Sequence, residues 1–217
     1  MNKRITVVIA VLLCVSAAAF AAGGDIRVGA AAGYGADWFS LGNDSGQEVF
    51  SNGGLYVSVD GSYDIADGIS VDLSAGFMTM GKCVLSYRED GDEPMSITAE
   101  EITDPCFSLY LGPSYRFNIT KEFSVTAGAG FDMMLGGFIH PVAESMRTNG
   151  RIGAGAQVRG SYSVADRIEV VLGARYSYYF INTNEVVQSN IDEVKKTDAV
   201  RSFQSGLKVF AGATYTL

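Results

Sequence analysis

The chain has 217 residues, of which 47% are hydrophobic and 18% are charged, with 26 glycines and a formal net charge of −8. This composition is apolar for a soluble domain, yet beyond residue 22 no apolar run approaches the roughly 18 residues of a membrane-spanning helix. Plentiful apolar residues and the lack of a short repeat also exclude disordered and collagen-like chains.

The first segment has the pattern of a secretory signal peptide. Two basic residues precede the apolar run 6–20, which ends in a small-residue cleavage motif at 19–21. A transmembrane anchor is the alternative, but the apolar run is short for one. We therefore predict that residues 1–21 are removed and that 22–217 form one domain with a net charge of −10. So acidic a chain is unsuited to binding nucleic acid.

The rest of the chain alternates apolar and polar residues with a period of two, which indicates β-strands. In the clearest segment, Leu109, Leu111 and Phe117 share one face, and mostly small or polar residues share the other. No amphipathic helix pattern intervenes between the strands. Eight such segments follow one another along the chain: 26–38, 55–65, 69–81, 107–119, 123–135, 151–164, 168–180 and 203–217.

The connections between these segments alternate in length. Tight turns are expected near 66–68, 120–122 and 165–167, and longer polar connections at 39–54, 84–105, 138–149 and 182–200. Short turns at one end and long connections at the other are the layout of an up-and-down barrel. We therefore predict an all-β fold, an eight-stranded antiparallel up-and-down β-barrel.

The two faces of the strands decide between a soluble, lipocalin-like barrel and a transmembrane one. The apolar face is almost free of charge, and its aromatic residues gather toward both strand ends, as in membrane-interface girdles. The polar face balances basic against acidic residues, which suits an interior where buried charges must pair. We therefore predict a transmembrane β-barrel with this interior charge network: Arg27, Asp60, Asp64, Asp72, Arg116, Asp132, Arg159, Glu169, Arg175 and Lys208.

This network is expected to fill the barrel, because eight strands leave an interior only wide enough for side chains. Glycines on the same face are expected to give the long arginines room. No catalytic, cofactor or metal site is expected in it. Within this network, we expect three arginines to form ion pairs with inward-facing carboxylates. The arginines are Arg116, Arg159 and Arg175, and the candidate partners are Asp60, Asp72, Asp132 and Glu169.

The last segment, 212–217, ends on alternating apolar residues and resembles the terminal β-signal of bacterial outer-membrane barrels. Residues 25–217 as a whole resemble the small OmpA-, OmpX- and OmpW-like barrel proteins. That resemblance implies a periplasmic N-terminus, long extracellular connections and contact with the outer-membrane assembly machinery. It also implies the outer membrane of a diderm bacterium, reached by the general secretory route. No periplasmic domain and no cell-wall tether are expected.

Cys83 and Cys106 flank the acidic connection 84–105 and form a candidate disulfide in an exported chain. Closing this loop would stabilise the fold by roughly 3 kcal/mol. Alternation puts Cys83 outward and Cys106 inward, so the disulfide needs a bulge, for which Asp104-Pro105 is a suitable place. The carboxylates at 90–93 could bind a divalent cation, but a solvated acidic loop is the simpler interpretation.

Three functions remain open. The leading hypothesis is a non-enzymatic, monomeric protein with a structural or surface-interaction role, whose four long connections contact an unidentified extracellular ligand. The second is a narrow porin-like channel for small solutes. The third is an enzyme acting on envelope lipids, for which His140, with Glu144 and Ser145 nearby, is the candidate general base. Nothing in their spacing brings these three side chains into contact.

Overall fold

The computed structural model describes the backbone of residues 24–43, 46–79, 83–89, 95–99, 106–139, 146–186 and 201–217. Side chains are described within these ranges for residues 24–38, 53–79, 106–136, 150–180 and 205–217. Cleavage after residue 21 lies outside the described residues and stays a prediction. In the described part of the chain, no helix is long and apolar enough to cross a membrane.

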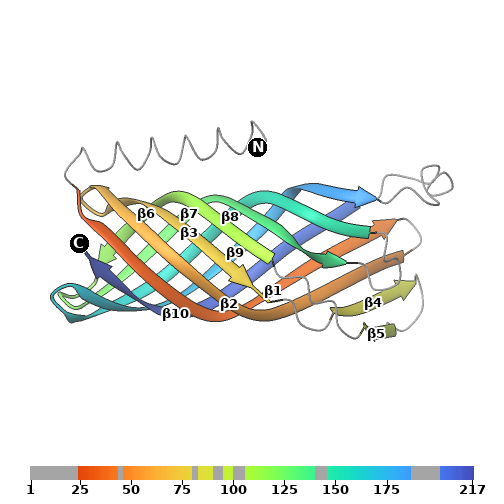
Figure 1. Ribbon diagram of the computed structural model, residues 1–217, viewed down its shortest axis with the longest axis horizontal. Helices are drawn as coiled ribbons and strands as arrows, with labels where there is room; N and C mark the ends of the chain where they lie inside the picture. Colours follow the sequence, from red (N-terminus) through yellow and green to blue (C-terminus); the bar gives the residue numbers. More distant parts are fainter. Residues whose placement is uncertain are drawn as a thin grey trace.

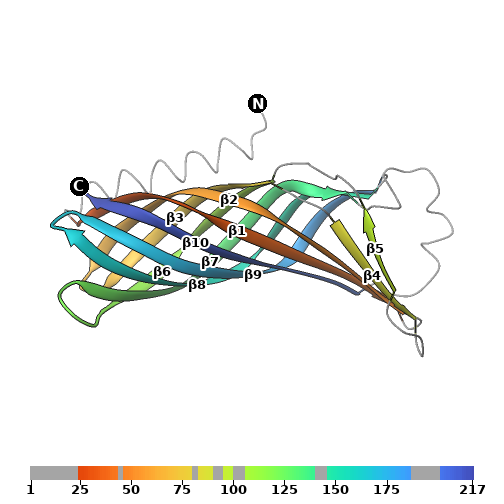
Figure 2. The same ribbon diagram turned by 90° about the horizontal axis from the view of Figure 1, so that it is seen from below.

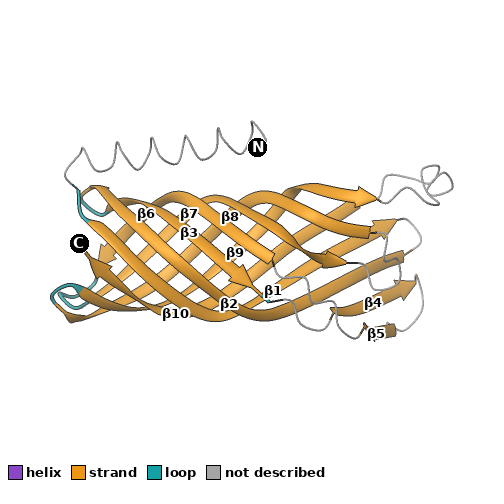
Figure 3. Ribbon diagram, viewed as in Figure 1, coloured by secondary structure: helices purple, strands orange, loops and turns teal. Residues whose placement is uncertain are grey.

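Eight long strands form a closed antiparallel barrel (Figures 1 and 3). Each strand pairs with its neighbours in chain order, and β1 pairs with both β2 and β10, which closes the sheet. The predicted all-β fold with eight antiparallel strands is confirmed. The barrel strands are β1 (Ile26–Asn43), β2 (Gly46–Ala66), β3 (Ile69–Met78), β6 (Cys106–Asn118), β7 (Phe123–Ile139), β8 (Met146–Ala165), β9 (Ile168–Val186) and β10 (Arg201–Thr216).

The first barrel strand, β1, begins on the side of the barrel that carries the tight turns, and the last strand, β10, ends on the same side (Figure 1). Gly68 forms the turn between β2 and β3 with a φ of 74°, a conformation that glycine adopts without the strain of a side chain. The last residue closes the ring, since the backbone N–H of Leu217 donates to the carbonyl oxygen of Ile26 at 2.9 Å.

The strands extend well beyond the alternating segments, so the predicted connections at 39–54, 138–149 and 182–200 are partly wrong. The first of them is almost entirely strand, because β1 continues to Asn43 and β2 begins at Gly46. Main-chain pairing needs no apolar face, whereas alternation marks only the part of a strand with one apolar side. Where a strand continues beyond that part, its sequence no longer alternates between apolar and polar residues, but its backbone still pairs with the neighbouring strand.

The predicted loop 84–105 is also partly wrong, since it contains a hairpin of β4 (Cys83–Glu89) and β5 (Met95–Ala99). This hairpin joins the sheet through β2, which pairs with β3 along Tyr56–Ala66 and with β4 along Gly46–Ser51. One long strand thus serves both the barrel and its extension. Figures 1 and 2 show the hairpin beside the far end of β2, opposite the tight turns.

The barrel is apolar outside and polar inside. Val59 and Leu172 are 67% and 65% exposed, whereas the interior Asp132 and Arg175 are 0% and 2% exposed. A soluble barrel would have the reverse distribution, so the lipocalin-like alternative is excluded. Exposed aromatic side chains lie toward both ends of the strands, with Tyr162 near the tight turns and Phe180 near the long connections.

Candidate functional site in the barrel interior

In the interior of the barrel, polar side chains from many strands converge. Strict alternation of the strands turns all ten residues of the expected charge network toward it. Two further charged residues lie there, Asp37 on β1 and Arg151 on β8, so that six basic and six acidic side chains share the lumen among the residues whose side chains are described. A low-dielectric interior requires such charges to be paired.

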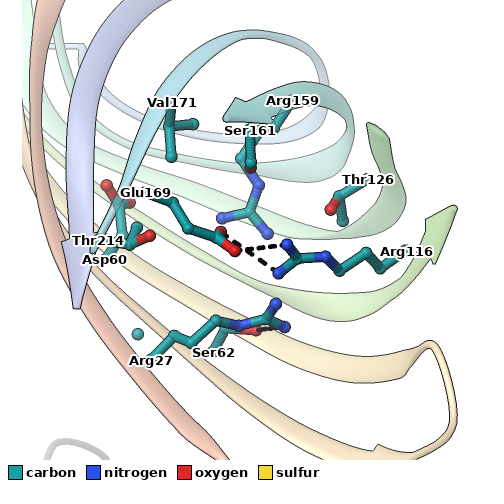
Figure 4. A pocket seen from close by; sticks show the side chains of 11 residues that line it. Arg27, Asp60, Ser62, Arg116, Thr126, Arg159, Ser161, Glu169, Val171 and Thr214 are labelled. Atoms are coloured by element: carbon teal, nitrogen blue, oxygen red, sulfur yellow. Dashed lines mark hydrogen bonds and ion pairs between the residues drawn. The ribbon is translucent and has the colours of Figure 1, made fainter. Parts of the chain in front are cut away.

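At the tight-turn end, two ion pairs bridge different strands. Arg116 on β6 donates to both carboxylate oxygens of Glu169 on β9, with Nη2–Oε1 at 2.5 Å and Nη1–Oε2 at 3.3 Å. Figure 4 shows these two side chains meeting across the lumen. Arg27 on β1 pairs with Asp64 on β2, with its Nη2 2.5 Å from Oδ1. The bidentate geometry between β6 and β9 fixes the orientation of both groups.

A small cavity of about 20 Å³ lies between these pairs. Arg27, Arg116 and Arg159 line it together with Asp60 and Glu169 (Figure 4). Its volume suits about one water molecule. Asp60 accepts a hydrogen bond at 3.0 Å from the hydroxyl of Ser58.

Asp72 on β3 organises the next layer. Its Oδ2 accepts hydrogen bonds from Nη2 of Arg159 at 2.5 Å and from Nε2 of Gln157 at 2.6 Å. The other end of that amide, Oε1, accepts from Nη2 of Arg175 at 3.1 Å. Arg175, which was expected to pair with a carboxylate, instead reaches Asp72 through Gln157. Its guanidinium also lies 4.2 Å from the ring centroid of Tyr110, a cation–π contact.

The layer nearest the long connections holds two ion pairs whose side chains are almost fully buried. Nη2 of Arg151 lies 3.0 Å from Oδ2 of Asp37, and these side chains are 2% and 3% exposed. Asp132 on β7 accepts from the hydroxyls of Ser177 at 2.8 Å and Tyr179 at 3.1 Å. Nζ of Lys208 lies 3.7 Å from the same carboxylate.

An apolar cluster completes this layer, and its members are fully or almost fully buried. They are Tyr56, Met78, Cys106, Met134, Tyr179 and Phe210. The rings of Tyr56 and Phe210 are 6.3 Å apart. In this layer, the cluster and the ion-paired side chains thus pack inside the barrel with almost no exposed surface.

The predicted disulfide is not confirmed, because Cys106 is a free cysteine that points into this cluster. The side chain of Cys83 lies outside the described residues, as do His140, Glu144 and Ser145 and the carboxylates at 90–93. Among the described residues, no group of three or more potential ligands could hold a metal ion.

Sequence reasoning missed Asp37, Arg151, Gln157 and Tyr110 as parts of the network. The signal was present, since Asp37 continues the inward alternation of Arg27 and Gly33, and Arg151 that of Gly153 and Arg159. Both ionic residues stand at the edge of an alternating segment, where the assignment of a face is weakest.

A closed barrel with an apolar exterior, an aromatic residue set at each end and a filled polar lumen defines a transmembrane β-barrel. A family model described as "Outer membrane protein beta-barrel domain" matches residues 7–209. The chain belongs to this family, which places the protein in the outer membrane of a Gram-negative bacterium. No curated protein matches the chain.

Several solved outer-membrane barrels share the fold. OprG from Pseudomonas aeruginosa is 13% identical with a TM-score of 0.51, over 89% of this chain and 96% of that one. A major outer membrane protein from Thermus thermophilus is 18% identical with a TM-score of 0.50, over 90% and 100%. The outer membrane protease OmpT from Escherichia coli is 9% identical with a TM-score of 0.50, over 89% and 97%. At these identities the likeness shows the fold alone.

Proposed function

We propose that this protein is a plugged outer-membrane barrel that acts by presenting contacts at the cell surface rather than by conducting solutes. The observation that carries the proposal is the filled lumen. Tyr56, Tyr110, Tyr179, Arg151 and Arg175 all lie inside it with almost no exposed surface. The cavity at the tight-turn end holds about 20 Å³, which is room for a water molecule rather than a solute.

The ion pairs support a permanently filled lumen. A passing solute would have to separate pairs such as Arg116–Glu169 and Arg151–Asp37, which lie across or beside its path. Separating a buried pair such as Arg151–Asp37 leaves uncompensated charges in a low-dielectric interior, which is strongly unfavourable. A narrow porin-like channel is therefore the less favoured function.

The surface contacts belong to the end with the long connections, where the β4–β5 hairpin extends the sheet. We propose that the barrel acts as a monomer in the bilayer, that assembly machinery inserts it, and that an extracellular ligand binds at this end. We propose no enzymatic activity. The likeness to the protease OmpT concerns the fold, and the candidate residues His140, Glu144 and Ser145 lie outside the described residues.

Single-channel recording in planar bilayers tests the proposal. The protein should show no steady conductance, whereas Tyr179→Ala, which removes a lumen-filling ring, should increase the frequency of conducting events. Tyr176→Ala removes a tyrosine from the lipid-facing side of the same strand and should leave the barrel closed. A steady large conductance of the unaltered protein would overturn the proposal and favour the channel.

A further inference from the structure

The lipid-facing wall of the barrel contains a groove of about 510 Å³. β2, β3, β6 and β7 each contribute two outward-facing residues to it, and all eight are apolar. This volume falls within the range of about 300–1,000 Å³ that is usual for small-molecule sites.

A small residue, Ala75, lines the middle of the groove. Ala75 on β3 pairs with Val59 on one side and with Leu109 on the other, so the row across three strands has only a methyl group at its centre. In the next row, Phe77 pairs with Phe107, and their rings meet edge to face at 5.4 Å. This aromatic pair forms a raised wall at the end nearer the long connections.

The groove lies within the part of the barrel that hydrocarbon surrounds. β3 has 10 residues, the length of a tilted strand that crosses the apolar core of a bilayer. Ala75 and Phe77 stand near its end at Met78, so the groove lies in the half of the membrane on the side of the long connections. Water would find almost no polar partner there, and apolar cavities stay dry.

We propose that this groove is a binding site for one acyl chain of a membrane lipid. The groove is continuous with the lipid-facing surface, and an acyl chain is the apolar object that this surface meets. A chain seated beside Ala75 would gain dispersion contacts with three strands and with the Phe77–Phe107 wall. The strand ladders hold these walls in place, so the site needs little ordering when the chain binds. The groove recognises the acyl chain of the lipid, so binding is independent of the lipid headgroup.

Native mass spectrometry of the full protein tests this site. Protein taken from vesicles of dimyristoylphosphatidylglycerol into mild detergent should retain one lipid, and protein from dimyristoylphosphatidylcholine vesicles should retain one as well. Ala75→Phe fills the groove and should abolish the retained lipid. Ala156→Phe adds the same ring at another outward-facing alanine, on β8, and should leave it unchanged.

Circular dichroism should show an unchanged β-sheet spectrum for both variants. If Ala75→Phe does not fold, Ala75→Leu is the substitute and should reduce the retained fraction. The proposal would be overturned by the absence of a retained lipid, by equal retention in the Ala75 variant, or by retention that follows the headgroup. A dimer mass that Ala75→Phe abolishes would also overturn it, because a second copy of the chain would then occupy the groove.

Discussion

At the scale of single residues, the lumen depends on charges that have partners and on glycines that have no room for a side chain. Arg151 and Asp37 illustrate the first case. They form a contact between β8 and β1, and both side chains are almost completely buried. Arginine stays protonated in proteins, so it cannot avoid the cost of burial by losing its charge. Its carboxylate partner is therefore essential to the packing around it.

Removing that partner should be costly. We expect Asp37→Leu to lower the free energy of unfolding by about 3–5 kcal/mol, because Arg151 is left buried and unpaired. The double variant with Arg151→Met should recover most of this loss, since an apolar pair of similar volume needs no compensation. Guanidinium titration of the protein in vesicles measures both. Asp67→Asn, in an exposed turn, is the control and should change the value by at most about 0.5 kcal/mol.

The glycines provide a second prediction from a matched pair of substitutions. A Cβ at Gly173 would stand 2.7 Å from the ring of Phe210 and 2.9 Å from Cγ of Arg159, whereas a Cβ at Gly61 would meet nothing within 4 Å. Gly173→Ala should therefore destabilise the barrel by about 1–3 kcal/mol through overpacking. Gly61→Ala should be neutral or should stabilise it by up to about 1 kcal/mol. Equal effects at the two positions in the same unfolding titration would contradict this explanation.

At the scale of the strands, the most telling element is β2, which pairs first with β3 and then with β4. Among the described residues, the hairpin of β4 and β5 pairs with the barrel through the ladder between β2 and β4. We expect that replacing residues 84–105 with a short turn leaves the thermal unfolding temperature within a few degrees of its original value. A large loss of thermal stability in a calorimetric scan would show instead that the hairpin supports the barrel.

The strands also show how far sequence reasoning extends. Alternation predicts eight strands and the inward face of residues such as Asp72 and Arg159, because one face meets hydrocarbon and the other does not. It does not predict β4, β5 or the outer parts of β1 and β2, where that contrast is lost. Nor does it predict that Gln157 links Arg175 to Asp72. Alternation predicts whether a side chain faces the lumen or the lipid. A contact across the lumen also depends on the tilt of the strands and on the position of each residue along the barrel axis.

At the scale of the whole molecule, the polar lumen and the apolar exterior both stabilise the barrel. Closing the sheet gives each strand two neighbours, so that backbone groups find partners where no water is present. The lumen adds a set of cross-strand ion pairs that suits one register. Charged side chains inside and a bilayer outside are thus compatible with one stable fold.

Because the first and last strands are in contact, the order of the strands along the sequence could be changed without changing which strands are neighbours. Leu217 and Ile26 are joined by a hydrogen bond, and β1 and β10 pair along their length. A short linker from Leu217 to Gly24 and a new opening at the exposed turn near Lys121 would give a circular permutant with the same ring of neighbours. We expect it to refold in vesicles to a barrel with the same β-sheet circular dichroism. Such a result would show that the fold depends on the circular order of the strands and not on which strand comes first in the sequence.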